Sequence, residues 1–238
     1  MHRPLRSLSL FLACLAAAFA AAVPAAHAAP ICGEGMYSYA GFTGFSARSG
    51  TTGVAASIEQ AAPLGVRAGH VAGWVGVVDP RSGGAWLQAG LSAMPGATRS
   101  SVYYEVAVPG RAPVYHQLAL PASSHRFAVR EERLHPGWWT VSVDGRSVAP
   151  PVHLPGSHGR WIPQVLGESW AGQATGECND YAYAFTGVQL LSRAGRPASG
   201  IAGPLHADAD YVVLHPSRTS FVAASRGVSG ARVPANGG

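Results

Sequence analysis

Three stretches of sequence decide the fold: AGWVGVV at residues 72–78, AWLQAGL at 85–91 and VYYEVAV at 102–108. Aromatic or branched side chains recur at alternate positions in these stretches, and proline and glycine fall in the gaps between them. Successive side chains of a β-strand point to opposite faces of the sheet, so this alternation is typical of half-buried strands. The three stretches therefore predict strands of an antiparallel sheet.

The same pattern continues along the chain and predicts an all-β fold, an antiparallel sandwich or jelly roll. Asp144-Gly145 predicts a two-residue hairpin turn, because this pair readily adopts the positive φ values that such a turn demands. After Leu191 the pattern weakens, and only two short strands are expected there. The predicted strands are Tyr37–Phe42, Gly53–Ile58, Ala72–Val78, Ala85–Leu91, Val102–Val108, Val114–Leu120, Arg126–Arg130, Trp138–Val143, Trp161–Ser169, Tyr181–Leu191, Tyr211–Leu214 and Ser220–Ala224.

The first 28 residues read as an export signal, with a basic start, an apolar run and the small-x-small pattern Ala26-His27-Ala28. An uncleaved membrane anchor is the alternative, but the apolar run is shorter than the roughly 20 residues that span a bilayer. We expect cleavage near Ala28 and a secreted protein that does not enter the membrane in its mature form. The mature chain is expected to have a β-sandwich domain over 29–191 and a C-terminal extension over 192–238 that ends in a disordered tail.

Composition excludes several function classes. All 17 basic residues are arginine, and the mature part carries 15 of them against 12 acidic residues, a net charge of +3. The arginines are scattered, whereas nucleic-acid binding favours a clustered basic face. The eight histidines after the signal are dispersed without metal-ligand spacing, so no metal and no cofactor is expected. The oxygen-rich stretches Asn179-Asp180 and Asp208-Ala209-Asp210 are interpreted as solvated turns. The chain is expected to be a monomer.

Two cysteines remain after the signal, Cys32 and Cys178. In an exported protein two such residues are expected to form a disulfide. This bond would tie the N-terminal strand to a late one, and free buried thiols are the alternative.

The candidate site residues are polar side chains that share a strand face with aromatic ones. Gln88 lies two residues from Trp86, and Glu168 lies two residues from Trp170, so each pair shares one face. By the same rule Tyr103 and Glu105 share a face. A polar side chain in such a strand either faces water or is buried with a partner. An antiparallel sheet could bring the Gln88 amide and the Glu168 carboxylate together on an aromatic floor.

The motifs at these positions resemble those of the glutamic peptidases, or eqolisins. The Trp-Val-Gly of Trp74–Val77, the Leu-Gln-x-Gly of Ala85–Gly90, the Tyr-Glu of Tyr103–Glu105 and the Glu followed by Trp in Gly167–Trp170 occur in that order. The resemblance covers roughly Gly53 to Leu191. It implies a concanavalin-like sandwich of two antiparallel sheets, of the kind found in concanavalin A-like lectins and glucanases.

The resemblance also implies a reaction. Glu168 would be the catalytic base that activates water, and Gln88 the amide that stabilises the oxyanion of the tetrahedral intermediate. Trp86, Tyr103, Glu105 and Trp170 would contact a peptide substrate. The alternative hypothesis is a non-catalytic secreted domain that binds a glycan or a peptide in the same groove. The chain departs from the family in the Ser169 inserted before Trp170 and in its basic pI of about 9.4.

Overall fold

The computed structural model describes residues 37–44, 51–80, 84–155, 161–172, 178–191, 197–201, 203–228 and 231. The predicted signal peptide and Cys32 lie outside these residues, so the cleavage site and the Cys32–Cys178 bond remain predictions. None of the described residues forms a helix long and apolar enough to cross a membrane.

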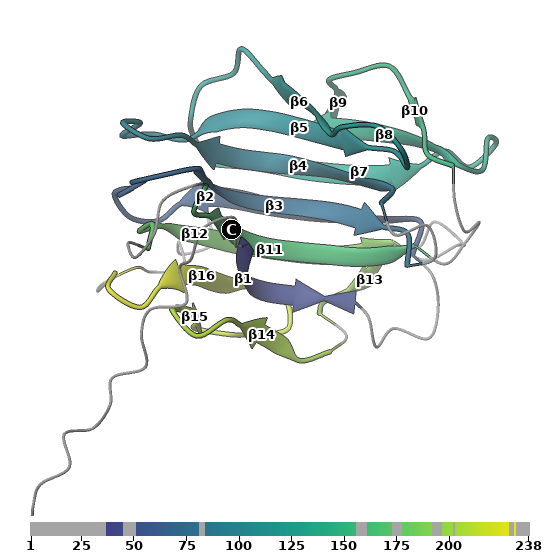
Figure 1. Cartoon of the computed structure of the whole chain (residues 1–238). Helices are drawn as coiled ribbons and strands as arrows, with labels where there is room; N and C mark the ends of the chain where they lie inside the picture. The colour runs from purple at the N-terminus through teal and green to yellow at the C-terminus, as the bar shows by residue number, and fades with distance from the viewer. Residues whose placement is uncertain are drawn as a thin grey trace, which may run out of the picture.

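Within the described residues the chain is built from β-strands, which form two antiparallel sheets stacked face to face (Figure 1). The predicted all-β, concanavalin-like sandwich is confirmed. The strands are β1 (Tyr37–Thr43), β2 (Gly53–Gln60), β3 (His70–Val78), β4 (Trp86–Ala93), β5 (Ser101–Ala107), β6 (Val114–Gln117), β7 (His125–Glu131), β8 (Trp138–Val143), β9 (Arg146–Ser147), β10 (Val152–His153), β11 (Ile162–Trp170), β12 (Ala182–Leu191), β13 (Pro197–Ser199), β14 (Leu205–Ala207), β15 (Tyr211–Leu214) and β16 (Phe221–Ser225).

The first sheet has the strand order β14-β1-β11-β3-β4-β5-β6. Strands that follow one another in sequence form only part of it, because β1 pairs with the late strands β11 and β14. The second sheet has the order β10-β8-β7-β2-β12-β16-β15, and β9 and β13 pair with β8 and β12 at its margins. Figure 1 shows the first sheet in front of the second, with strands of both running across the view.

The core lies between the two sheets and explains why apolar side chains occur at alternate positions along the strands. Val75, Leu87 and Val165 point inward from the first sheet, and Phe127 and Phe185 point inward from the second. All five side chains are buried in one hydrophobic cluster. Because neighbours in a strand face opposite ways, the residues between them in the first sheet point to its outer face. The outer face of that sheet therefore carries the candidate site residues.

The predicted hairpin at Asp144-Gly145 is confirmed. Both residues have positive φ, 50° for Asp144 and 77° for Gly145, and the turn joins β8 to β9. The predicted strands are present with ends that differ by a few residues, and β3 begins at His70, before the predicted Ala72. This earlier start brings an unexpected side chain onto the outer face.

Candidate functional site on the outer face of the first sheet

The register of the first sheet aligns the candidate residues in rows that run across the strands. Gln88 pairs with Gly76 on one side and with Glu105 on the other. Glu168 pairs with Ala72. The two rows are four residues apart on β3, about 13 Å along the strand at a rise of about 3.3 Å per residue. Gln88 and Glu168 therefore share a face but belong to different rows, so the sheet does not bring the amide and the carboxylate together as the sequence led us to expect.

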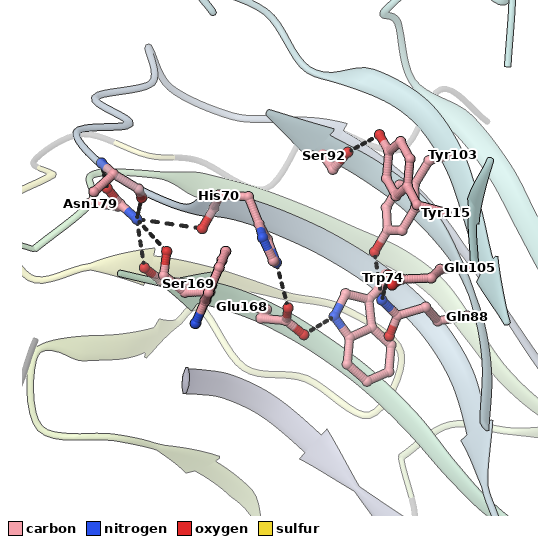
Figure 2. Close-up of polar contacts among 12 residues, drawn as sticks. His70, Trp74, Gln88, Ser92, Tyr103, Glu105, Tyr115, Glu168, Ser169 and Asn179 are labelled. Atoms are coloured by element: carbon pink, nitrogen blue, oxygen red, sulfur yellow. Dashed lines mark hydrogen bonds and ion pairs between the residues drawn. The ribbon is translucent and has the colours of Figure 1, made fainter. Parts of the chain in front are cut away.

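Trp74 lies in the row between them. It pairs with Leu166 on β11 and with Gly90 on β4. Its indole Nε1 donates a hydrogen bond of 2.9 Å to Oε2 of Glu168, and its side chain is buried (Figure 2). The carboxylate and the amide thus stand on either side of one indole ring, and no direct hydrogen bond joins them.

Glu168 is buried, with only 5% of its surface exposed, and both its carboxylate oxygens have partners. Oε2 accepts from Trp74, and Oε1 lies 2.9 Å from Nε2 of His70. Glu168 is therefore a buried carboxylate with a hydrogen-bond partner at each oxygen.

Gln88 is 7% exposed and belongs to a second group of polar side chains. Its Nε2 donates to the Tyr103 hydroxyl over 3.1 Å and to Oε2 of Glu105 over 3.3 Å. Burial and the charge of Glu168 raise the pKa of Glu105, while His70 and the hydrogen bond from Gln88 oppose this rise. The structure thus brings three of the predicted residues, Gln88, Tyr103 and Glu105, into direct contact.

Two glycines of the motifs leave room for this arrangement. A Cβ on Gly76 would lie 3.0 Å from Cβ of Gln88 and 3.1 Å from Cζ3 of Trp74. A Cβ on Gly90 would overlap the carbonyl oxygen of Gly73. The Trp-Val-Gly and Leu-Gln-x-Gly motifs thus have a packing reason: their glycines let Trp74 and Gln88 lie side by side on the sheet.

A pocket of about 140 Å³ opens between the two polar groups. Its walls include Tyr103 and Glu105, which were predicted to contact substrate, and it is lined by His70, Ala72, Ser92, Met94, Tyr103, Glu105 and Tyr115. Neither Gln88 nor Glu168 is among the lining residues. Among the described residues, no group of His, Cys, Asp and Glu side chains could hold a metal ion.

Aromatic rings flank the pocket on both sides. The rings of Tyr103 and Tyr115 stack with centroids 5.1 Å apart. On the other side Trp170 stacks with Tyr37 at 6.0 Å and lies against His70 at 5.5 Å. Trp170 thus belongs to an aromatic cluster beside the pocket.

The other predicted aromatic contact, Trp86, lies farther away. It pairs with Val78 and Ala107, one row beyond Gln88, and does not line the pocket.

Three residues that position or complete the site were not found from the sequence. His70 shares the face of Trp74, four residues earlier, and extending the alternation backward from Trp74 would have found it. Ser92 and Tyr115 meet across the pocket, with 2.7 Å between their hydroxyl oxygens.

The interpretation of Asn179 as part of a solvated turn is wrong. Asn179 is 1% exposed, and its Nδ2 donates to the carbonyl oxygens of Ala68 and Trp170 over 2.8 and 3.2 Å. Its Oδ1 accepts from the N–H of Arg67 over 2.8 Å. Figure 2 shows Asn179 beside Ser169 and the backbone of His70, where it links the start of β3 to the end of β11.

Comparison with solved structures bears on the fold. A scytalido-glutamic peptidase bound to a peptide-based transition state analog matches with a TM-score of 0.55 and 16% identity, over 81% of this chain and 99% of that one. SCP-B, an eqolisin in complex with the tripeptide Ala-Ile-His, matches with a TM-score of 0.52 and 15% identity over the same shares. The chain has the fold of the glutamic peptidases. At this identity the likeness establishes the fold, and function has to come from the site.

A Bacillus licheniformis β-glucanase also matches, with a TM-score of 0.37 and 16% identity, over 58% of this chain and 65% of that one. No protein-family model matches the chain, and no curated protein matches its sequence. The eqolisin-like fold expected from the motifs is thus confirmed by the structural matches.

Proposed function

We propose that this protein is a secreted hydrolase that cleaves peptide bonds in the pocket on the outer face of the first sheet. The observation that carries the proposal is the buried Glu168 carboxylate, held by Trp74 and His70, with the Gln88 amide on the same face. A buried carboxylate that is hydrogen-bonded at both oxygens beside a pocket is a candidate for chemistry.

The two groups have separate tasks in this proposal. Glu168 supplies the negative charge that activates a water molecule, and the Nε2–H of Gln88 stabilises the oxyanion. A base works about 3 Å from the water it activates, and an oxyanion donor works about 3 Å from the carbonyl oxygen. For both groups to act on one substrate, its scissile carbonyl would have to lie above Trp74, between the carboxylate and the amide.

The hydrogen bond from Gln88 to Glu105 is long, at 3.3 Å. A substrate oxyanion formed beside Gln88 would compete with Glu105 for one N–H of its amide group. Catalytic hydrogen bonds are often long in the absence of substrate and shorten in the complex. Glu105, Tyr103 and Trp170 would contact the peptide, as the sequence predicts.

A binding protein without catalysis is the second candidate function. The observation that favours it is the pair of aromatic stacks beside the pocket, Tyr37 with Trp170 and Tyr103 with Tyr115. Aromatic faces bind sugar rings as well as peptide side chains. In this case the outer face would hold a glycan or a peptide without changing it.

The test is cleavage of a mixed peptide library by the secreted chain between about pH 3 and 8, read out by mass spectrometry. Glu168→Gln is compared with the unchanged chain, and circular dichroism checks that both are folded. We expect cleavage by the unchanged chain and its loss in the variant. Equal cleavage by both would reject the proposal, and binding of a glucan oligosaccharide without cleavage would favour the second candidate.

A further inference from the structure

His70 stands between Glu168 and the pocket. Its Nε2 is 2.9 Å from Oε1 of Glu168, and its side chain is 21% exposed and lines the pocket. Glu168 itself is buried and does not line the pocket. A group that takes a proton from water has to be within hydrogen-bond reach of that water. The imidazole meets this condition better than the carboxylate.

The hydrogen bond to Glu168 indicates which nitrogen of His70 would be basic. Nε2 of His70 lies 2.9 Å from Oε1 of Glu168, and a carboxylate oxygen accepts hydrogen bonds. With Nε2 as the donor, a neutral imidazole has its lone pair on Nδ1. Among the described residues, the ring hydrogen bond of His70 is the one at Nε2, and the residue lines the pocket, so we infer that Nδ1 is open to a water there.

The orientation of the imidazole is also fixed. The ring lies against Trp170, and its edge meets the ring of Tyr37 at 6.2 Å. Asn179 donates to the carbonyl oxygens of Ala68 and Trp170, which holds the start of β3 against the end of β11. A base held in this way needs little reorganisation before it reacts.

The opposite wall of the pocket carries Glu105. Burial and the charge of Glu168 raise the pKa of Glu105, and the charge of His70 acts against this rise. The three groups are therefore close enough to influence one another across the pocket. A positive charge that forms on His70 during the reaction would face one carboxylate directly and a carboxyl group across the pocket.

We propose that His70 is the proton-accepting residue of this site and that Glu168 is the residue that positions it. The proposal rests on the hydrolase function proposed above, but it makes His70, in place of Glu168, the group that takes the proton from water. Nδ1 of His70 accepts a proton from water as the water oxygen bonds to the peptide carbonyl carbon, and the charge moves onto the carbonyl oxygen beside Gln88. The imidazolium, paired with Glu168, then gives its proton to the leaving nitrogen as the C–N bond breaks. A free acid and a free amine result, and Glu168 stays unprotonated, as the carboxylate of a carboxylate–histidine pair does.

Two variants of His70 separate proton transfer from positioning. His70→Gln keeps an N–H donor for Glu168 but has no basic nitrogen, so we expect a folded protein whose kcat falls about 10²–10⁴-fold, the usual contribution of a general base. His70→Ala leaves a space beside the pocket, and added imidazole should restore part of its activity. Gln88→Ala is the control, because imidazole cannot replace an amide donor and should not restore it. Full activity of His70→Gln, or no effect of imidazole on a folded His70→Ala, would overturn the proposal.

A second measurement does not depend on activity. Nitrogen-15 NMR of the histidine rings reports which nitrogen carries the proton, and we expect the Nε2–H tautomer for His70 in the unchanged chain and a loss of this preference in Glu168→Gln. A chain that cleaves no peptide would reject the proposed function, and the NMR result would still decide the geometry of His70. The Nδ1–H tautomer in the unchanged chain would overturn the inference about His70 whether or not the chain is a peptidase.

Discussion

Trp74 donates its indole N–H to Glu168 from a strand position midway between the rows of Glu168 and Gln88. One side chain thus both satisfies the buried carboxylate and separates it from the amide. Trp74 therefore contributes to the site through its hydrogen bond to Glu168 and to the sheet through its buried ring.

Replacing Trp74 by Phe is expected to destabilise the protein. The variant keeps most of the ring but leaves Oε2 of the buried Glu168 without its donor, and a hydrogen bond to a charged group contributes about 1.5–3 kcal/mol. Urea unfolding at pH 7 measures the loss. Trp86→Phe is the matched control, because Trp86 is half-buried on the same face and does not contact Glu168. Equal losses in both variants would contradict this role of Trp74.

Gln88→Ala is expected to lower kcat about 10²–10³-fold, the usual effect of removing one oxyanion donor. KM should change little, because the donor acts mainly in the transition state. Gln164→Ala is the control, since Gln164 lies in the same row on β11 and pairs with the same Gly76. A variant of Gln88 that keeps its kcat would remove the amide from the mechanism.

Glu105 should make stability depend on pH in a defined direction. Its pKa is raised above 4.5 in the folded chain by burial and by Glu168, so the folded state binds more protons than the unfolded state above pH 4.5. Its contribution is therefore most favourable below pH 4.5 and falls as the pH rises through the folded-state pKa. We expect Glu105→Gln to melt at a higher temperature than the unchanged chain at pH 7 and at a similar temperature at pH 3.5. Melting curves at the two pH values, with Glu59→Gln as control, decide this, and the opposite order would contradict it.

His125 should act in the same direction, because its pKa is also raised in the folded chain. Burial would lower the pKa of His125, but its hydrogen bonds to Asp144 and to the carbonyl of Pro121 outweigh burial and raise it. The groups that face it are Asp144, the Ser123 hydroxyl, the Pro121 carbonyl and the edge of Phe127.

The folded state therefore holds the proton on His125 to higher pH than the unfolded state. The stabilisation is complete below the unfolded pKa of about 6.5 and is lost as the pH rises through the raised folded value. We expect His125→Gln to lose more stability at pH 5.5 than at pH 9 in urea unfolding. The double variant with Asp144→Asn should show little further loss. A loss that is the same at both pH values would contradict the ion pair.

The alternation of side chains made the strands and their faces predictable from sequence. The outward positions of Gln88, Glu105 and Glu168 follow from the period of two alone. The Asp144-Gly145 turn was predictable because its positive φ values are a local property of the residues.

The pairing partners were not predictable in the same way. β1 lies between β11 and β14, and β12 between β2 and β16, and these neighbours are set by burial across the whole domain. The separation of Gln88 from Glu168 by Trp74 depends on this register, which no local pattern encodes. Asn179 was missed for the same reason, because its partners on β3 and β11 come close only in the folded chain.

The most direct test is a crystal structure of Glu168→Gln bound to a peptide that the unchanged chain cleaves. We expect the peptide to cross the pocket, with its scissile carbonyl oxygen about 3 Å from Nε2 of Gln88 and its carbonyl carbon facing His70. A peptide bound on another surface, or one whose cleaved bond contacts neither Gln88 nor His70, would contradict it.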